Sequence, residues 1–199
     1  MILKVFKHHF YARAGWIQRP LAAHSVNDWL LEPASLTQRL IALGQGFHVQ
    51  QIFQGKRKAN FDEANVLGIN PRDEVFLREV LLFCGHQPVV FAHSITAMAS
   101  LRHSWKSLQG LGNQSLGNML FNNPKVRRTA FQFKKLNPHH PLMRRMNQIQ
   151  ELRQALDSPR QSVWARRSQF FMQEQSSAIM VTEVFLPSLS KLDHKDWGQ

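Results

Sequence analysis

The sequence predicts an α+β fold in a single domain over residues 1–199, with a six-stranded antiparallel sheet. Three observations favour this class. Six segments are apolar, or alternate apolar with polar side chains, at the two-residue spacing of β-strands. The helical segments are few and lie between the strands. Of the 199 residues, 43% are hydrophobic and 19% are charged, a composition typical of a folded domain with a buried core.

The strands are predicted from side-chain periodicity. They are expected at Phe47–Gln54, Val75–Phe83, Pro88–Ile95, Thr129–Lys134, Arg166–Gln173 and Ala178–Leu186. Cys84-Gly85-His86-Gln87 and Gln173–Ser177 have the composition of turns, so the strands that flank each turn are expected to form antiparallel hairpins. The predicted architecture is an antiparallel sheet with helices on one side.

Three short helices are predicted from caps and apolar spacing. They are expected at Val26–Leu31, Leu36–Leu43 and Leu116–Phe121, with N-caps at Ser25, Ser35 and Ser115. The second helix also has Gln38 at the capping-box position and Gly44 where it should end. Leu36 and Leu116 are thus first helical residues, whose backbone N–H groups have no partner inside the helix.

Two basic segments accompany the predicted core. Met1–Pro20 contains four Lys or Arg and no acidic residue, but lacks the apolar core and cleavage site of a secretion signal. We interpret it as a surface arm, with an organelle transit peptide as the alternative. Asn137–Ser162 has prolines near its ends and a helical pattern over Met143–Leu156. We interpret this segment as a basic, peripheral insertion between two strands.

The positive charge predicts an anionic partner. The formal net charge is +12, and Lys125–Arg167 contains eleven Lys or Arg against two acidic residues. The partner could be nucleic acid, an anionic membrane surface or a small carboxylate. The sequence contains no nucleic-acid-binding motif, no interleaved aromatic pattern, and no apolar run of about 18 residues. Nucleic-acid binding and a transmembrane segment are therefore not expected.

Other reactive residue types give weak signals. The single cysteine, Cys84, cannot form an internal disulfide, and its place beside an apolar strand predicts a buried, unreactive thiol in a reducing cytoplasm. His8-His9 and His139-His140 lack the spacing and company of metal ligands, so no metal site is expected. Residues 110–117 contain three glycines without a phosphate-binding pattern, and are interpreted as a flap hinge.

Charged side chains inside apolar strands are the more informative signal. Alternation places Arg78 on one face with Val80 and Leu82, and Glu79 on the opposite face. Glu183 likewise shares a face with apolar side chains. A buried, unpaired charge costs free energy, so these residues need partners. Either Arg78 and Glu183 pair with each other, or they line a pocket that holds an anion and transfers a proton.

Five motifs, in this order, resemble those of chorismate pyruvate-lyases. They are Ser35-Leu36-Thr37-Gln38-Arg39-Leu40, Leu77-Arg78-Glu79-Val80-Leu81-Leu82, Leu116-Gly117, Trp164-Ala165-Arg166-Arg167-Ser168 and Thr182-Glu183-Val184-Phe185-Leu186-Pro187. The resemblance covers roughly Trp29–Leu189. It implies a six-stranded antiparallel sheet with helical flaps that enclose an internal ligand cavity. It also implies a cofactor-independent lyase that converts chorismate to 4-hydroxybenzoate and pyruvate, the first step of ubiquinone biosynthesis.

The resemblance implies roles for four residues. Arg78 matches the arginine that binds the carboxylate of the aromatic product, and a guanidinium can hold a carboxylate through two parallel N–H bonds. Glu183 matches the glutamate at the opposite end of the ring. It is the candidate general acid, because a carboxyl in an apolar site holds its proton more strongly. Leu36 and Leu116 match positions whose backbone N–H groups bind the ring carboxylate, which agrees with their expected places at helix starts.

The sequence departs from the family pattern at three places. Leu36 stands where some relatives have methionine, a change that a backbone contact tolerates. His93 stands where arginine is common. If that arginine binds the second carboxylate of chorismate, binding here should be weaker or depend on pH. The insertion Asn137–Ser162 is longer than in compact members, and no function is assigned to it.

Three functions are compared. The first is a monomeric chorismate pyruvate-lyase. The second is a non-catalytic sensor domain for a small aromatic acid, because ligand-binding modules of some bacterial transcription regulators share the fold. Only 34 residues precede the first motif, too few for the winged helix-turn-helix of such regulators. The third, a nucleic-acid-binding protein, is favoured by net charge alone; Arg166 and Arg167 point to opposite sides of a strand, so at most one of them joins a pocket.

Overall fold

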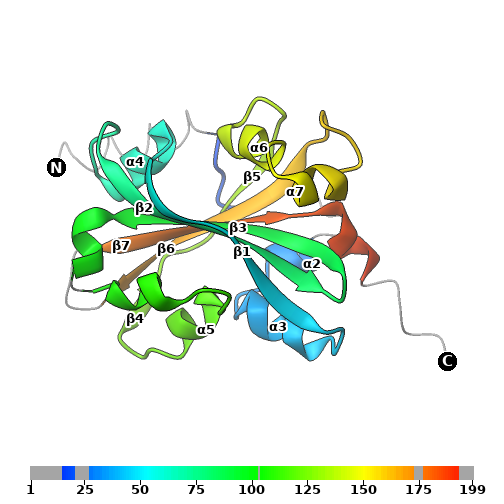
Figure 1. The fold of residues 1–199 in the computed structure, drawn as a ribbon, viewed down its shortest axis with the longest axis horizontal. Helices are drawn as coiled ribbons and strands as arrows, with labels where there is room; N and C mark the ends of the chain where they lie inside the picture. Colours follow the sequence, from blue (N-terminus) through cyan, green and yellow to red (C-terminus); the bar gives the residue numbers. More distant parts are fainter. Residues whose placement is uncertain (1–14, 21–26, 103, 173–176, 193–199) are drawn as a thin grey trace.

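An antiparallel sheet forms the centre of the fold (Figure 1). The computed structural model describes residues 15–20, 27–102, 104–172 and 177–192. Within these residues the strand order is β1-β2-β3-β7-β6-β4, with β5 also paired to β6, and all pairs are antiparallel. The strands are β1 (Phe47–Lys58), β2 (Glu74–Cys84), β3 (Gln87–Ala97), β4 (Val126–Arg128), β5 (Gln132–Leu136), β6 (Val163–Met172) and β7 (Ala178–Phe185).

Five of the six predicted strands are present, with shifted ends. The β2–β3 hairpin is confirmed, and Gly85 in its turn adopts a φ of +59°, a conformation that glycine favours. Strands β6 and β7 pair as predicted, although residues 173–176 of their predicted turn lie outside the described residues. The hairpins place β3 and β7 side by side in the middle of the sheet.

The predicted strand Thr129–Lys134 is wrong in its bounds, because a bulge at residues 129–131 separates β4 from β5, and β5 begins at Gln132. Arg128 lies opposite Phe170 of β6, whereas Gln132 lies opposite Arg167. Three residues, 129–131, therefore face only two residues of β6. Such a bulge changes which side chains point to each face of the sheet.

Short helices cover both faces of the sheet, so the prediction of helices on one side is wrong, while the α+β class is confirmed. In Figure 1, α4, α6 and α7 lie along one side and α2, α3 and α5 along the other. The helices are α2 (Asn27–Leu30), α3 (Leu36–Ala42), α4 (Phe61–Leu67), α5 (Leu116–Phe121), α6 (Pro141–Met146) and α7 (Gln150–Ala155), with 3-10 helices η1 (Met98–Arg102), η2 (Lys106–Gly110) and η3 (Pro187–Lys191). Of the predicted caps, Ser25 lies outside the described residues.

Helix α4 was missed, although the sequence contains its signals. Asn60 precedes the helix, and Glu63 three residues later accepts a hydrogen bond from the Asn60 backbone N–H at 2.9 Å, as in a capping box. Gly68 ends the helix in the left-handed conformation, with a φ of +66°. The helix between these two signals has only seven residues, so apolar spacing alone did not predict it.

The insertion 137–162 is not peripheral. Its helices α6 and α7 bury Leu142, Met143, Met146 and Leu152 in a core cluster shared with side chains of β2, β3, β6 and β7. Arg144 and Arg153 of these helices are exposed, which explains why composition suggested a surface segment. The insertion therefore supplies one of the two layers that cover the sheet.

The described end of the N-terminal arm is also part of the fold. Trp16 is buried, and its indole N–H donates a hydrogen bond to Asp62 at 3.1 Å. Ile17 pairs with Phe133 of β5 through two backbone hydrogen bonds. Residues 15–20 thus extend the sheet edge at β5 rather than forming a free surface arm.

Truncation of a core side chain in the insertion should destabilise the whole protein. Leu152 is fully buried, so Leu152→Ala should lower the free energy of unfolding by about 2–5 kcal/mol, measured by urea denaturation. Arg153→Ala, an exposed change on the same helix, is the matched control and should have little effect. Equal stability of the two variants would contradict the assignment of the insertion to the core.

Candidate functional site

A cavity lies between one face of the sheet and helices α3 and α5. Its empty volume is about 590 Å³, with the solvent at its opening included. Strands β2, β3, β6 and β7 contribute side chains to its floor. The four residues singled out in the sequence, Leu36, Arg78, Leu116 and Glu183, all line this cavity. The structure thus brings together residues that are far apart in the chain.

Strand register explains how Arg78 and Glu183 come to share the cavity. Arg78 of β2 lies opposite Ser94 of β3, and Ala92 of β3 lies opposite Glu183 of β7. Residues directly opposite each other point to the same face of a sheet. Neighbouring strands are about 4.8 Å apart, so the backbones that carry Arg78 and Glu183 are roughly 10 Å apart. The small side chains of Ala92 and Ser94 lie between them and leave room for a ligand.

Arg78 is a buried cation without a carboxylate partner. Its side chain is 2% exposed, and Nη2 donates hydrogen bonds to the backbone oxygens of Gly112 and Gln114, at 2.8 and 2.7 Å. Among the described residues, nothing accepts a hydrogen bond from its Nε, and no carboxylate lies within ion-pair distance. Burial lowers the pKa of Arg78 to about 10, because the charged form loses hydration. This guanidinium is arranged to receive an anion.

Glu183 forms an ion pair with Arg166, not with Arg78. The two residues lie directly opposite each other on β7 and β6, and Arg166 Nε donates to Glu183 Oε2 at 2.5 Å. Arg166 Nη1 also donates to three backbone oxygens of residues 29–32, at 2.7–3.1 Å. The expected apolar surroundings of Glu183 are therefore wrong. The pair fixes the carboxylate at a defined place in the cavity.

Helices α3 and α5 are joined to each other at the cavity. Ser35 caps α3 as predicted, and its hydroxyl accepts a hydrogen bond from the Gln38 N–H at 3.4 Å. Ser115 precedes α5 as predicted, but its hydroxyl bonds Thr37 Oγ1 at 2.7 Å instead of its own helix. A Cβ atom on Gly117 would lie 2.9 Å from Thr37 Oγ1, so glycine permits this close approach. The N-terminal ends of α3 and α5 are thus held together, and the two helices cover the cavity as one unit.

Arg128 and Phe131 were not predicted as site residues, and the sequence left open whether Arg166 or Arg167 joins the pocket. Arg166 lines the cavity, while Arg167 points to the other face and bonds Asp62 at 3.0 Å, as alternation predicted. Arg128 and Phe131 also line the cavity, although residues three apart on a regular strand point to opposite faces. The bulge between β4 and β5 turns both toward the cavity, and no sequence signal identified this bulge.

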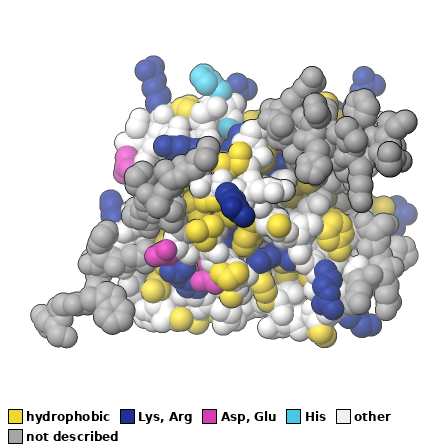
Figure 2. Space-filling model, turned by 180° about the vertical axis from the view of Figure 1, so that it is seen from behind, with side chains coloured by type: hydrophobic (Ala, Val, Ile, Leu, Met, Phe, Trp, Pro, Cys, Tyr) yellow, Lys and Arg dark blue, Asp and Glu magenta, His cyan; other side chains and the backbone are white. Residues whose placement is uncertain are grey.

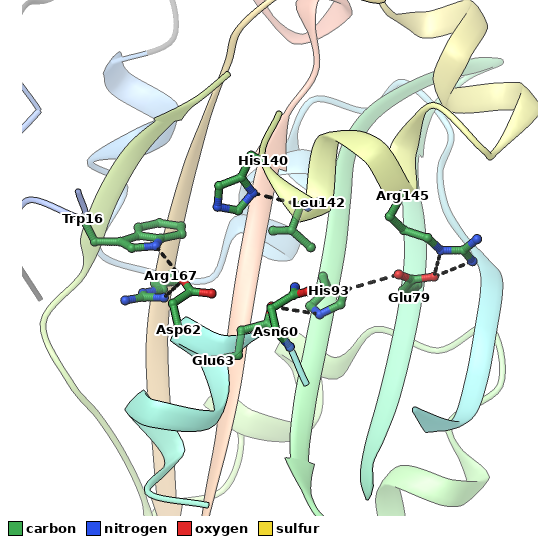
Figure 3. A network of polar contacts seen from close by, with 10 residues as sticks. All are labelled: Trp16, Asn60, Asp62, Glu63, Glu79, His93, His140, Leu142, Arg145 and Arg167. Carbon is green, nitrogen blue, oxygen red and sulfur yellow. Dashed lines mark hydrogen bonds and ion pairs between the residues drawn. The ribbon is translucent and has the colours of Figure 1, made fainter. Parts of the chain in front are cut away.

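His93 does not line this cavity and belongs to a separate polar network (Figure 3). It lies between two carboxylates, with Nε2 3.2 Å from Glu63 Oε1 and Nδ1 3.3 Å from Glu79 Oε1. Arg145 of α6 extends the chain with two hydrogen bonds to Glu79 Oε2, at 2.8 and 2.7 Å. The neighbouring Ala92 points into the cavity, and successive strand residues point to opposite faces. Position 93 does not line the cavity, so the structure gives no support to the expectation that histidine in place of arginine here weakens ligand binding or makes it depend on pH.

In the His93 network, a positively charged imidazole lies between the negatively charged carboxylates of Glu63 and Glu79. Burial by itself lowers the pKa of His93, but Glu63 and Glu79 outweigh this effect and raise it to about 9. Burial raises the pKa of Glu63 and Glu79, but contacts with His93, and with Arg145 in the case of Glu79, outweigh it and lower both pKa values. The network joins α4 and α6 to the centre of the sheet.

The remaining surface offers few other functional groups. In the part of the chain that the structure describes, no three His, Cys, Asp or Glu side chains are grouped to hold a metal ion. Likewise, none of the helices in the described ranges has the length and apolar character needed to cross a bilayer. Lys and Arg side chains are scattered over the face in Figure 2 and do not form one continuous patch there. The cavity is therefore the main candidate site.

The fold and the site together define an α+β protein whose cavity carries more cations than carboxylates among its described lining residues. Solved structures of bacterial regulators share the fold. The effector domain of PhnF from Mycobacterium smegmatis matches with a TM-score of 0.52 and 14% identity, over 78% of this chain and 90% of that one. A GntR-family transcriptional regulator from Bacillus cereus matches with a TM-score of 0.51 and 16% identity, over 71% and 92%. At these identities the likeness concerns the fold alone.

Sequence relatives identify the family. The profile of the family described as chorismate lyase matches residues 10–193. A probable chorismate pyruvate-lyase of Nitrosomonas eutropha is 43% identical, over 89% of this chain and 96% of its own length. One of Cupriavidus pinatubonensis is 37% identical, over 94% and 95%. The chain belongs to the chorismate lyase family.

The charged state of His93 should make stability depend on pH. Its pKa in the folded protein, about 9, is above the ordinary value of 6.5, so its stabilising effect is complete below about pH 6.5 and is lost as the pH rises through about 9. The melting temperature should therefore fall as the pH is raised over this interval, measured by circular dichroism.

His93→Asn tests the origin of this dependence. The variant leaves the buried carboxylate of Glu63 without its cation and leaves Glu79 with Arg145 alone, so it should lose about 3–5 kcal/mol at neutral pH and show a flatter alkaline profile. His86→Asn, a change in the exposed β2–β3 turn, is the matched control. A parent-like pH profile for His93→Asn would show that another group causes the dependence.

Proposed function

We propose that this protein is a chorismate pyruvate-lyase that eliminates pyruvate from chorismate and yields 4-hydroxybenzoate. The observation that carries the proposal is the buried Arg78, which has no carboxylate partner among the described residues and lines the cavity. Family membership and relatives named probable chorismate pyruvate-lyase support it. The proposed reaction requires no cofactor, because aromatisation of the ring drives the elimination.

In the proposed complex, Arg78 holds the ring carboxylate. A guanidinium forms two parallel hydrogen bonds with a carboxylate, which fixes the orientation of the ring as well as its position. The backbone N–H groups of Leu36 and Leu116 assist it, because both residues line the cavity and both begin a helix. This end of the site then carries every donor that the ring carboxylate needs.

Glu183 is placed to exchange the proton at the other end of the ring. The C4 hydroxyl and the C3 ether of chorismate point away from the ring carboxylate, toward the Arg166–Glu183 pair. We propose that Glu183 takes the proton from C4 while the C3–O bond breaks, and then returns it to the methylene carbon of the departing enolpyruvate. The atoms balance as 4-hydroxybenzoate and pyruvate. Glu183 is paired with the Arg166 guanidinium, and it thus obtains from C4 of the substrate the proton that it later donates.

The cellular setting is proposed on the same basis. The 4-hydroxybenzoate would enter ubiquinone biosynthesis, and a single cysteine, buried at Cys84, suits a reducing cytoplasm. We propose a monomer, since one chain contributes every group named in the site. The alternative of a non-catalytic aromatic-acid sensor has the support of the shared fold alone, and the fold by itself does not determine function.

Product formation tests the proposed reaction directly. Purified protein with chorismate and without added metal should release 4-hydroxybenzoate and pyruvate in equal amounts, measured by liquid chromatography and by a lactate dehydrogenase assay. Tight binding of 4-hydroxybenzoate without any turnover of chorismate would instead favour the sensor. Formation of 3-hydroxybenzoate would sink the proposed regiochemistry.

Two substitutions should separate binding from chemistry. Glu183→Gln should lower kcat by about 100-fold or more while 4-hydroxybenzoate still binds, because the amide cannot exchange the proton. Glu151→Gln, on the exposed side of α7, is the matched control.

Arg78→Met should weaken 4-hydroxybenzoate binding by about 30-fold or more, measured by calorimetry. Because the change removes an uncompensated buried cation, the melting temperature of the ligand-free variant should equal or exceed that of the parent. A variant that unfolds more easily and binds normally would assign Arg78 to structure rather than to the ligand.

A further inference from the structure

The charge of the cavity exceeds what one carboxylate requires. Three of the described lining residues, Arg78, Arg128 and Arg166, are cations, and one, Glu183, is an anion, which leaves an excess of two positive charges. The proposed substrate is a dianion, with one carboxylate on the ring and another on the enolpyruvyl group. Arg78 accounts for the first. A second cation should therefore meet the enolpyruvyl carboxylate.

The second positive centre lies beside Glu183. Arg128 and Arg166 both pack against Phe131, with guanidinium carbons 4.1 and 4.2 Å from the ring centre. Both guanidinium groups thus lie against the Phe131 ring, and that of Arg166 is hydrogen-bonded to the Glu183 carboxylate. Burial lowers the pKa of Arg128, the charge of Arg166 lowers it further, and Glu183 only partly opposes them. The local charge favours a further anion at this end.

Arg128 has more capacity for that anion than Arg166. Arg166 donates hydrogen bonds to Glu183 and to three backbone oxygens of residues 29–32, and these bonds use much of its donor capacity. Arg128 donates to the backbone oxygen of Pro33 at 2.8 Å, and a guanidinium has five N–H donors. It also lies directly opposite Phe170, which lines the cavity, so its strand position directs it toward the ligand.

We infer that Arg128 binds the enolpyruvyl carboxylate of chorismate, an inference that rests on the proposed function. The enolpyruvyl group is attached at C3, next to the C4 oxygen that faces Glu183, and so its carboxylate reaches the same end of the cavity. The product 4-hydroxybenzoate lacks this carboxylate. Arg128 therefore distinguishes substrate from product, whereas Arg78 holds both.

The inference is tested by removing the charge from the protein and from the ligand in turn. The two ligands are 3-(1-carboxyvinyloxy)benzoate, a stable dianion, and 3-(isopropenyloxy)benzoate, in which a methyl group replaces the second carboxylate. Calorimetry would measure both with the parent, with Arg128→Gln and with Arg127→Gln. Arg127 is the adjacent exposed residue of β4 and serves as the matched control.

The parent and Arg127→Gln should prefer the dianion by about 30-fold or more, and Arg128→Gln should lose this preference. Arg128→Gln should also raise the KM for chorismate while the Kd for 4-hydroxybenzoate stays close to that of the parent. A preference retained in Arg128→Gln, or absent in the parent, overturns the inference. Equal weakening of both ligands also overturns it, because Arg128 would then merely support the cavity.

The activity of the parent on chorismate is read separately. If the parent forms 4-hydroxybenzoate but the ligand preference does not depend on Arg128, the inference fails and the proposed function stands. If the preference depends on Arg128 but no product forms, the reaction fails and the dianion site stands.

Discussion

A buried guanidinium that finds no carboxylate partner in the described part of the chain is the constraint on which the site depends. Arg78 lies on a central strand, where hydration is lost, and two backbone oxygens of the loop before α5 satisfy only part of its hydrogen-bonding capacity. A buried cation in this state reduces the stability of the free protein, and binding of an anion offsets that cost. The same loop leads into α5, so the residue that receives the ligand also positions the helix that covers it.

The two faces of the sheet handle buried charge differently. On the far face, His93 lies between Glu63 and Glu79, and Arg145 completes a network of alternating charge that needs no ligand. On the cavity face, cations outnumber carboxylates. Electrostatic balance on one face gives a rigid support, and imbalance on the other gives affinity for an anion. The insertion contributes to function indirectly, because its helix α6 supplies Arg145 to the supporting face.

The fold alone does not separate a lyase from a ligand sensor. Regulators that share this architecture at 14–16% identity have the same kind of sheet, so the distinction must come from the side chains in the cavity. A sensor needs groups that hold its ligand, whereas a lyase also needs a group that moves a proton. The ion pair that positions Glu183 at the end of the cavity away from Arg78 is therefore the feature that favours catalysis.

The sequence by itself determined the α+β class, five strands, the cap of α3, the start of α5, and the placement of Arg78 and Glu183 on strand faces. These features follow from local periodicity and capping, which residues close in sequence control. Tertiary structure alone decided that Glu183 pairs with Arg166, that His93 faces away, and that a bulge turns Arg128 and Phe131 into the cavity. It also decided that the insertion belongs to the core. Those outcomes depend on strand register and on which face each helix covers, and both are fixed by contacts between residues far apart in the chain.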